Sequence, residues 1–231
     1  WLSVDPLADK CPDISPYNYC AWNPVKLVDP DGEEVDDYKF NAKTGELLLT
    51  RKTNDKFDLI EVEGSNGIQS PISVPKGILN GENEGDDLSK TGFSVTNTKL
   101  MQLAVDLTVK LSYLCNKEIA MGAYGQNADN ISELSICPWS TSLCNHVQSV
   151  LEKFQLKFIA HIHPGCPGDE SSGTGTPSDK DWDMLETFPG VDQFIISRKD
   201  GLSSFVRCDA KPPQTPVILK HFGKQTCWKQ K

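Results

Sequence analysis

The sequence predicts an α+β fold, and three observations carry this prediction. Apolar residues recur at helical spacing over residues 98–114 and 141–154. Short apolar segments of strand length, bounded by glycine, proline or polar turn sequences, lie between and after these helices. Over residues 38–63, three alternating segments follow one another across turn-rich joints, a pattern typical of a small β-meander. We therefore expect a mixed β-sheet flanked by helices and preceded by that meander.

Residues 1–37 differ in composition from the rest of the chain. Repeated X-Pro pairs punctuate this segment, and each pair biases its first residue toward extended or turn geometry. The segment has little apolar bulk, yet Tyr17, Tyr19 and Trp22 are spaced as anchors to a partner surface. We expect residues 1–37 to be an irregular edge of a larger structure, and the chain to be a piece of a longer protein.

Residues 38–95 are expected to form the meander and a linker. The alternating segments predict strands over 38–42, 46–52 and 57–62. Repeated glycines and the acidic run 82–87 follow, and we interpret residues 64–95 as a linker or long surface loop.

Residues 96–231 are expected to form the main domain. Its predicted helices cover 98–114, 141–154 and 178–188, where Ser140 and Ser178 are candidate caps. Residues 126–138 are expected to be a loop, and strands are predicted over 118–124, 156–163, 191–197, 202–209 and 216–222.

Length and charge exclude several classes of protein. A chain of 231 residues can bury a core without help from disulfides or metal. Its 23 Lys and Arg against 32 Asp and Glu give a net charge of −9, which argues against a nucleic-acid partner. No run of apolar residues approaches the roughly 18 that a membrane-spanning helix needs. The eight cysteines form no C-x-x-C pair and are too sparse for a disulfide scaffold.

Two of the four histidines end a predicted buried strand. His161 and His163 are two residues apart, so their side chains point to the same face of that strand. Two imidazoles on one face can bind one metal ion, and neutral imidazole is a good zinc ligand. Pro164 and Gly165 then end the strand and expose the pair. The alternative is a chance pair of histidines on a solvated strand edge.

Two carboxylates are candidates for the same site. Asp181 lies one turn inside the helix that Ser178 starts, from where it can supply the third ligand of a catalytic zinc site. The alternative is that the S-x-x-D pattern is only a helix-start capping box. Glu118 opens an otherwise apolar strand, where a carboxylate needs either a partner or a chemical role. Its alternative is an edge residue that faces water.

Together these residues resemble the JAB/MPN (JAMM) metallopeptidase family. The family pattern of a strand Glu, H-x-H-P and S-x-x-D is matched by Glu118, by His161-Ile162-His163-Pro164, and by Ser178 with Asp181. The resemblance covers about residues 98–223 and implies a JAB/MPN-like sheet and a Zn²⁺ ion. The 15 positions from His163 to Ser178 exceed the usual family spacing, and the additional residues are a candidate substrate-binding or inhibitory flap.

The resemblance and the chemistry of zinc assign a role to each residue. His161, His163 and Asp181 would be the metal ligands, and zinc lowers the pKa of a bound water to about 7. Glu118 would accept a proton from that water and pass it to the leaving amine. Ser178 would donate a hydrogen bond to the developing oxyanion. The expected enzyme is a zinc peptidase or isopeptidase that acts on a protein or peptide.

The N-terminal motif resembles the end of an RHS-repeat-associated core. The match covers about residues 1–32, from Trp1-Leu2-Ser3-Val4-Asp5-Pro6 to Asp29-Pro30-Asp31-Gly32. Such cores close large secreted shells and precede a variable toxin. The resemblance therefore implies a secreted bacterial effector that is made in the cytoplasm and delivered to a target cell. Its implied partners are the rest of the RHS shell and a cognate immunity protein.

Two other functions are left open at this point. The chain could be a non-peptidase effector, such as a nuclease, although its net charge of −9 argues against that class. It could also be a catalytically inactive MPN-like module that binds a partner, although the complete Glu, His, His and Asp set argues against this.

Overall fold

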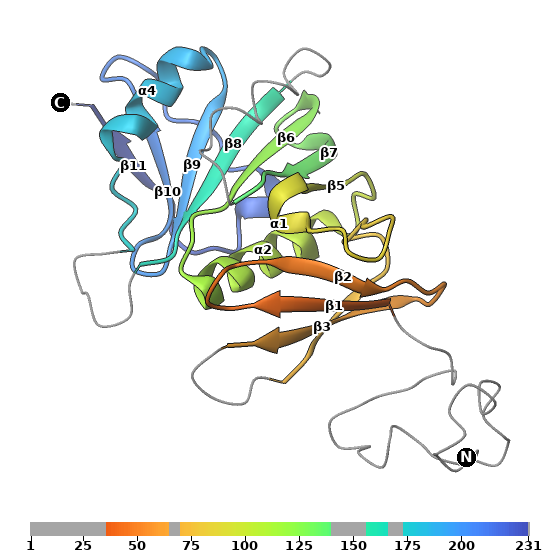
Figure 1. The fold of residues 1–231 in the computed structure, drawn as a ribbon. Helices are drawn as coiled ribbons and strands as arrows, with labels where there is room; N and C mark the ends of the chain where they lie inside the picture. Colours follow the sequence, from red (N-terminus) through yellow and green to blue (C-terminus); the bar gives the residue numbers. More distant parts are fainter. Residues whose placement is uncertain (1–35, 65–69, 140–155, 166–172, 231) are drawn as a thin grey trace, which may run out of the picture.

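The computed structural model describes residues 36–64, 70–139, 156–165 and 173–230, and these residues form an α+β fold with two mixed β-sheets (Figure 1). The RHS-like motif of residues 1–32 and the predicted helix over 141–154 lie outside the described residues. Within the described ranges, no helix has the length and apolar character required to cross a membrane.

The smaller sheet has the strand order β2-β1-β3-β4. Its strands are β1 (Asp36–Asn41), β2 (Leu47–Arg51), β3 (Phe57–Glu63) and β4 (Ile72–Pro75). β1 pairs with β2 in antiparallel and with β3 in parallel, so the predicted meander is wrong. The alternating pattern located the three strands along the chain but did not predict their order in the sheet. After β2 the chain crosses the start of β1, where the Thr53 N–H donates to the Asp36 carboxylate, and β3 therefore lies on the other side of β1.

Residues 70–95, the described part of the expected linker after residue 64, are not the surface loop that the glycines and acidic residues suggested. They contribute β4, the short helix α1 (Leu88–Thr91) and β5 (Phe93–Val95). Asp87 caps α1 and also accepts a hydrogen bond from the Leu47 N–H of β2, so the end of the acidic run is held against the smaller sheet. Several side chains of this segment are buried, including Ile78, Leu79, Leu88 and Phe93.

The larger sheet has the strand order β11-β10-β9-β8-β6-β7-β5. β8 and β9 are parallel, as are β10 and β11, and the remaining pairs are antiparallel. Helix α2 (Met101–Cys115) packs on one face and helix α4 (Asp179–Thr187) on the other. The strands added here are β6 (Ala120–Asn127), β7 (Asn130–Ile136), β8 (Leu156–His163), β9 (Asp192–Ser197), β10 (Gly201–Val206) and β11 (Thr226–Lys229).

Two predicted elements of this region are wrong. The segment 126–138, expected to be a loop, contains the end of β6 and strand β7, whose Ser and Glu residues obscured the apolar alternation. The segment 216–222, expected to be a strand, forms the short 3-10 helix η3 (Val217–Leu219). Leu219 is fully buried in the main core and Ile218 packs against it, while β11 takes the place beside β10.

One buried cluster joins the two sheets. It contains Tyr38 and Phe40 of the smaller sheet together with Phe158 and Phe194 of the larger one. Helix α2 lies between the sheets and adds its buried face to the cluster (Figure 1). At the boundary, the Trp139 indole N–H donates to the Gly45 carbonyl at 2.5 Å. The smaller sheet is therefore packed against the layer that carries the histidine pair.

A buried ionic group lies at one end of the smaller sheet. The Asp58 side chain has no exposed surface, and its carboxylate lies 3.4 Å from the Lys76 ammonium. Lys76 also contacts the Asp36 carboxylate, and neither Asp58 oxygen has a hydrogen-bond partner within the described residues. Burial raises the pKa of Asp58, Lys76 lowers it and Asp36 raises it again, which gives a pKa of about 7.

This raised pKa predicts how protein stability changes with pH. Between about pH 4, where a free aspartate titrates, and about pH 7, the folded protein holds a proton that the unfolded chain releases. The contribution of Asp58 to the free energy of unfolding is therefore fully present below this range and lost as the pH rises through it. Asp58→Asn cannot ionise, so it should raise the thermal midpoint relative to the parent at pH 8 but not at pH 4. Thermal scans across this range test the prediction. Glu61→Gln, at an exposed position on the same strand, is the control. If the thermal midpoints of Asp58→Asn and the parent differ by the same amount at every pH, the prediction is wrong.

Candidate metal centre

The histidine pair lies on the central strand β8. Phe158, Ala160 and Ile162 of this strand belong to the main core on the α2 side. Because side chains alternate along a strand, His161 and His163 point to the opposite face, toward α4. Their Nε2 atoms are 3.0 Å apart, and His161 is only 3% exposed. The predicted placement of both imidazoles on one face of a buried strand is therefore confirmed.

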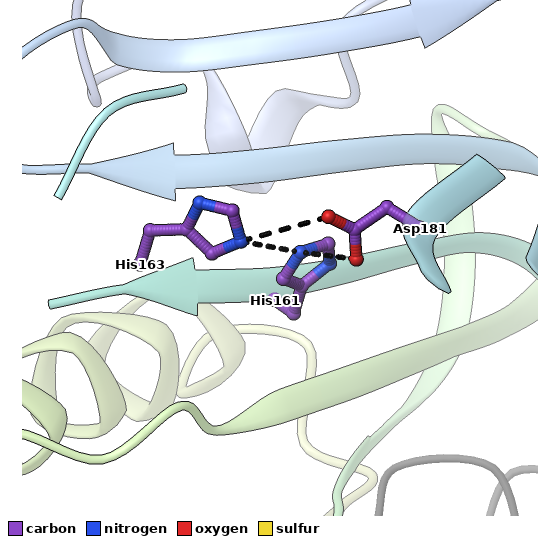
Figure 2. A group of neighbouring side chains, drawn as sticks. All are labelled: His161, His163 and Asp181. Carbon is purple, nitrogen blue, oxygen red and sulfur yellow. Dashed lines mark hydrogen bonds and ion pairs between the residues drawn. The ribbon is translucent and has the colours of Figure 1, made fainter. Parts of the chain in front are cut away.

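Asp181 approaches the pair from the first turn of α4. Ser178 caps this helix in a capping box, and the acidic first turn suits the positive end of the helix dipole. The Asp181 Oδ1 atom lies 3.2 Å from His161 Nε2, and its Oδ2 atom lies 3.8 Å from His163 Nε2 (Figure 2). The ligand atoms of the three residues all lie within 4.8 Å of one another, so this buried group can hold a metal ion.

Ser178 orients the Asp181 carboxylate. Its backbone N–H and its hydroxyl donate to Asp181 Oδ2, at 2.6 Å and 2.8 Å. Oδ1 accepts no hydrogen bond from Ser178 and remains directed at His161. Burial raises the pKa of Asp181, but the contact with His161 and the hydrogen bonds from Ser178 outweigh it and lower the pKa to about 2. Asp181 is therefore ionised at neutral pH, as a metal ligand must be.

A backbone carbonyl determines the tautomer of His163. The His163 Nδ1 atom lies 2.9 Å from the Thr174 carbonyl oxygen. Since a carbonyl can only accept, Nδ1 carries the hydrogen and the Nε2 lone pair of the neutral ring faces the metal site. Burial and the adjacent His161 lower the pKa of His163, which favours this neutral form.

Glu118 lies at the rim of the group. It precedes β6, whose first residue, Ala120, pairs with His161 on β8. Its Oε1 atom is 3.9 Å from His163 Nε2, and its side chain is 58% exposed. The structure thus brings together all five residues singled out in the sequence. The Ser178 hydroxyl donates to Asp181 Oδ2, and its oxygen accepts from the Asp181 N–H, which is the helix-capping contact.

Four other residues around the group were missed by the sequence analysis. Phe205 of β10 packs edge-on against two rings, with centroid distances of 6.5 Å to His161 and 5.4 Å to Trp182. Thr174 contacts His163 through its backbone carbonyl, and the Asp200 carboxylate accepts from the Gly175 N–H. Phe205 lies in the segment predicted as a strand over 202–209, so strand geometry could have located it, whereas a carbonyl contact leaves no mark in a sequence.

One of the two remaining histidines lies within the described residues, and it pairs elsewhere. His221, which is exposed, pairs with Asp106 of α2 at 2.6 Å and contacts Gln102 at 3.1 Å. His146 lies outside the described residues.

The donor set matches the chemistry of a catalytic zinc site. Two imidazole nitrogens and one carboxylate oxygen are the protein ligands that leave a fourth zinc position for water or substrate. No family model, curated protein or solved structure matches the chain.

Proposed function

We propose that the chain is a zinc-dependent hydrolase, and specifically a peptidase or isopeptidase of the JAB/MPN (JAMM) type. The observation that supports this is the convergence of His161, His163 and Asp181 within 4.8 Å. Glu118 lies beside them, 3.9 Å from His163, and supplies the carboxylate of a general base.

The ligand set favours zinc over other common metals. Magnesium and calcium prefer oxygen ligands, whereas two imidazoles with one carboxylate suit zinc. When bound, zinc polarises a substrate carbonyl and lowers the pKa of water. The remaining chemistry belongs to the protein. Glu118, which is exposed at the rim, takes a proton from the attacking water and delivers it to the leaving amine.

Ser178 has two roles in this proposal. Its backbone N–H holds Asp181 Oδ2 at 2.6 Å independently of the side chain. The hydroxyl can therefore rotate away from the carboxylate and donate to the oxyanion that forms on the substrate. When the hydroxyl turns to the substrate, one half of the capping box remains, because the Asp181 side chain still accepts from the Ser178 N–H.

The biological setting follows from the motif at residues 1–32 and forms part of the proposal. We propose that the chain is the toxin end of a secreted RHS-type bacterial effector, made in the cytoplasm and delivered to a target cell. Its partners would be the RHS shell, an immunity protein in the producing cell, and a protein or peptide substrate.

Metal analysis combined with a cleavage screen tests this function. The purified chain should contain about one zinc per molecule and cleave members of a library of peptides and isopeptide-linked substrates. A chelator should abolish cleavage, and added zinc should restore it. Cleavage of nucleic acid instead would indicate a nuclease-like effector. Bound zinc without cleavage of any kind would indicate an inactive binding module.

A further inference from the structure

We propose that Asp200 is a positioning residue for His163 and acts through the backbone of segment 173–175. This inference rests on the proposed function, because His163 is taken to be a metal ligand. Asp200 lies in the turn between β9 and β10. Its carboxylate does not reach the metal group directly, so its role is to hold the Thr174 carbonyl in place.

The β9–β10 turn forms two hydrogen bonds with segment 173–175. The Gly175 N–H donates to Asp200 Oδ2 at 2.6 Å, and the Lys199 N–H donates to the Gly173 carbonyl at 3.3 Å. Thr174 lies between these two hydrogen bonds and accepts from His163. The carbonyl that sets the His163 tautomer is therefore fixed on both sides.

The turn itself is anchored next to His163. Ser197, at the end of β9, is the register partner of His163 on β8. The Ser197 Oγ atom accepts from the Asp200 N–H at 3.1 Å. Asp200 thus connects β9, the strand beside His163, to segment 173–175, whose Thr174 carbonyl contacts the His163 imidazole.

Close packing shows that segment 173–175 has little room to move. A Cβ at Gly175 would lie 2.0 Å from the Ser203 hydroxyl, and one at Gly173 would lie 2.9 Å from the Gly165 Cα. Gly173 also has a φ of +67°, a conformation that side chains disfavour. The backbone is pressed against β10 on one side and the end of the β8 segment on the other. Within this packed backbone, the Asp200 hydrogen bond orients the Gly175 amide and, with it, the Thr174 carbonyl of the same peptide group.

Outer contacts of this kind tune a metal site. A ligand histidine whose second nitrogen donates to a fixed acceptor keeps its lone pair aimed at the metal, and loss of that support weakens metal binding about 10-fold to 100-fold. Without Asp200, the Thr174 carbonyl can turn away, and His163 can then place its hydrogen on Nε2 instead.

The test compares Asp200→Ala with Asp200→Asn in the whole chain. Asp200→Ala removes the acceptor, whereas the Asn side chain keeps an amide oxygen that can accept from Gly175. Asp209→Ala, which removes an exposed carboxylate in the turn after β10, is the matched control. The readouts are the His163 tautomer by nitrogen NMR in the metal-free protein, and zinc affinity by competition with a chelator.

We expect the parent, Asp209→Ala and Asp200→Asn to keep the hydrogen on His163 Nδ1. Asp200→Ala should show a mixture of tautomers and bind zinc about 10-fold more weakly, with an unchanged thermal midpoint in the metal-free state. An unchanged tautomer in a folded Asp200→Ala variant would overturn the positioning role, even if the parent binds zinc. If Asp200→Ala does not fold, Asp200→Leu, which has a side chain of similar size without an acceptor, takes its place, and the same two outcomes of the tautomer measurement support or overturn the role. A parent that binds no zinc would refute the proposed function, and the tautomer would still decide the role of Asp200.

Discussion

Replacing Glu118 with glutamine should lower turnover by about 100-fold or more while the zinc content stays at the parent level. The amide keeps the size of the side chain but cannot accept and return a proton. The side chain is 58% exposed and is not one of the three grouped ligand residues, so folding and metal binding do not depend on its charge. Steady-state rates on a cleaved peptide, elemental analysis and thermal scans measure the three properties.

Glu133→Gln is the matched control for this variant. Glu133 lies on β7, where it pairs with Tyr124 rather than approaching the histidines, so its replacement should leave the rate unchanged. If Glu118→Gln cleaves as fast as the parent, the proton is moved by another group. A loss of rate in Glu133→Gln instead would identify that residue as the carboxylate to study next.

Removal of either buried ligand should abolish stoichiometric zinc binding. His161→Ala deletes the imidazole nearest to Asp181, and Asp181→Ala deletes the oxygen 3.2 Å from it. Each variant leaves two protein ligands, which is fewer than the three that a catalytic zinc site retains. Elemental analysis after gel filtration should show about one zinc in the parent and a small fraction of that in both variants.

His221→Ala is the control for the loss of zinc. It removes a histidine that also contacts an aspartate, at 2.6 Å on the surface of α2, but it touches none of the three grouped residues. This variant should keep its zinc. Full zinc in both His161→Ala and Asp181→Ala would place the metal elsewhere and refute the proposed centre.

The sequence predicted the metal group better than it predicted the sheet around it. His161 and His163 are related by strand periodicity, and Ser178 with Asp181 by the local geometry of a helix start. Both relations extend over only a few residues, so they can be read from the sequence directly. Their convergence was expected from a family pattern, and the structure supplies the distances.

Longer-range features were not predictable in the same way. The parallel pairing of β1 with β3 depends on the route of the chain past Asp36, which alternation does not encode. The contact between Thr174 and His163 uses a backbone carbonyl, and any residue could supply one. β7 was missed because the polar Ser135, which is buried in the sheet, does not look like a core residue.

If the chain is the toxin of a longer effector, as proposed above, the shared core of the two sheets limits where it can be cut from that carrier. Cleavage between the sheets would remove the Gly45 carbonyl that accepts from Trp139. It would also remove Tyr38 and Phe40, which share a buried cluster with α2. The fragment left behind would carry the three ligand residues on an exposed apolar layer and would be prone to aggregate. For the proposed enzyme to remain active after release, a processing site would therefore have to lie before Asp36. The Asp29-Pro30-Asp31-Gly32 motif meets that requirement.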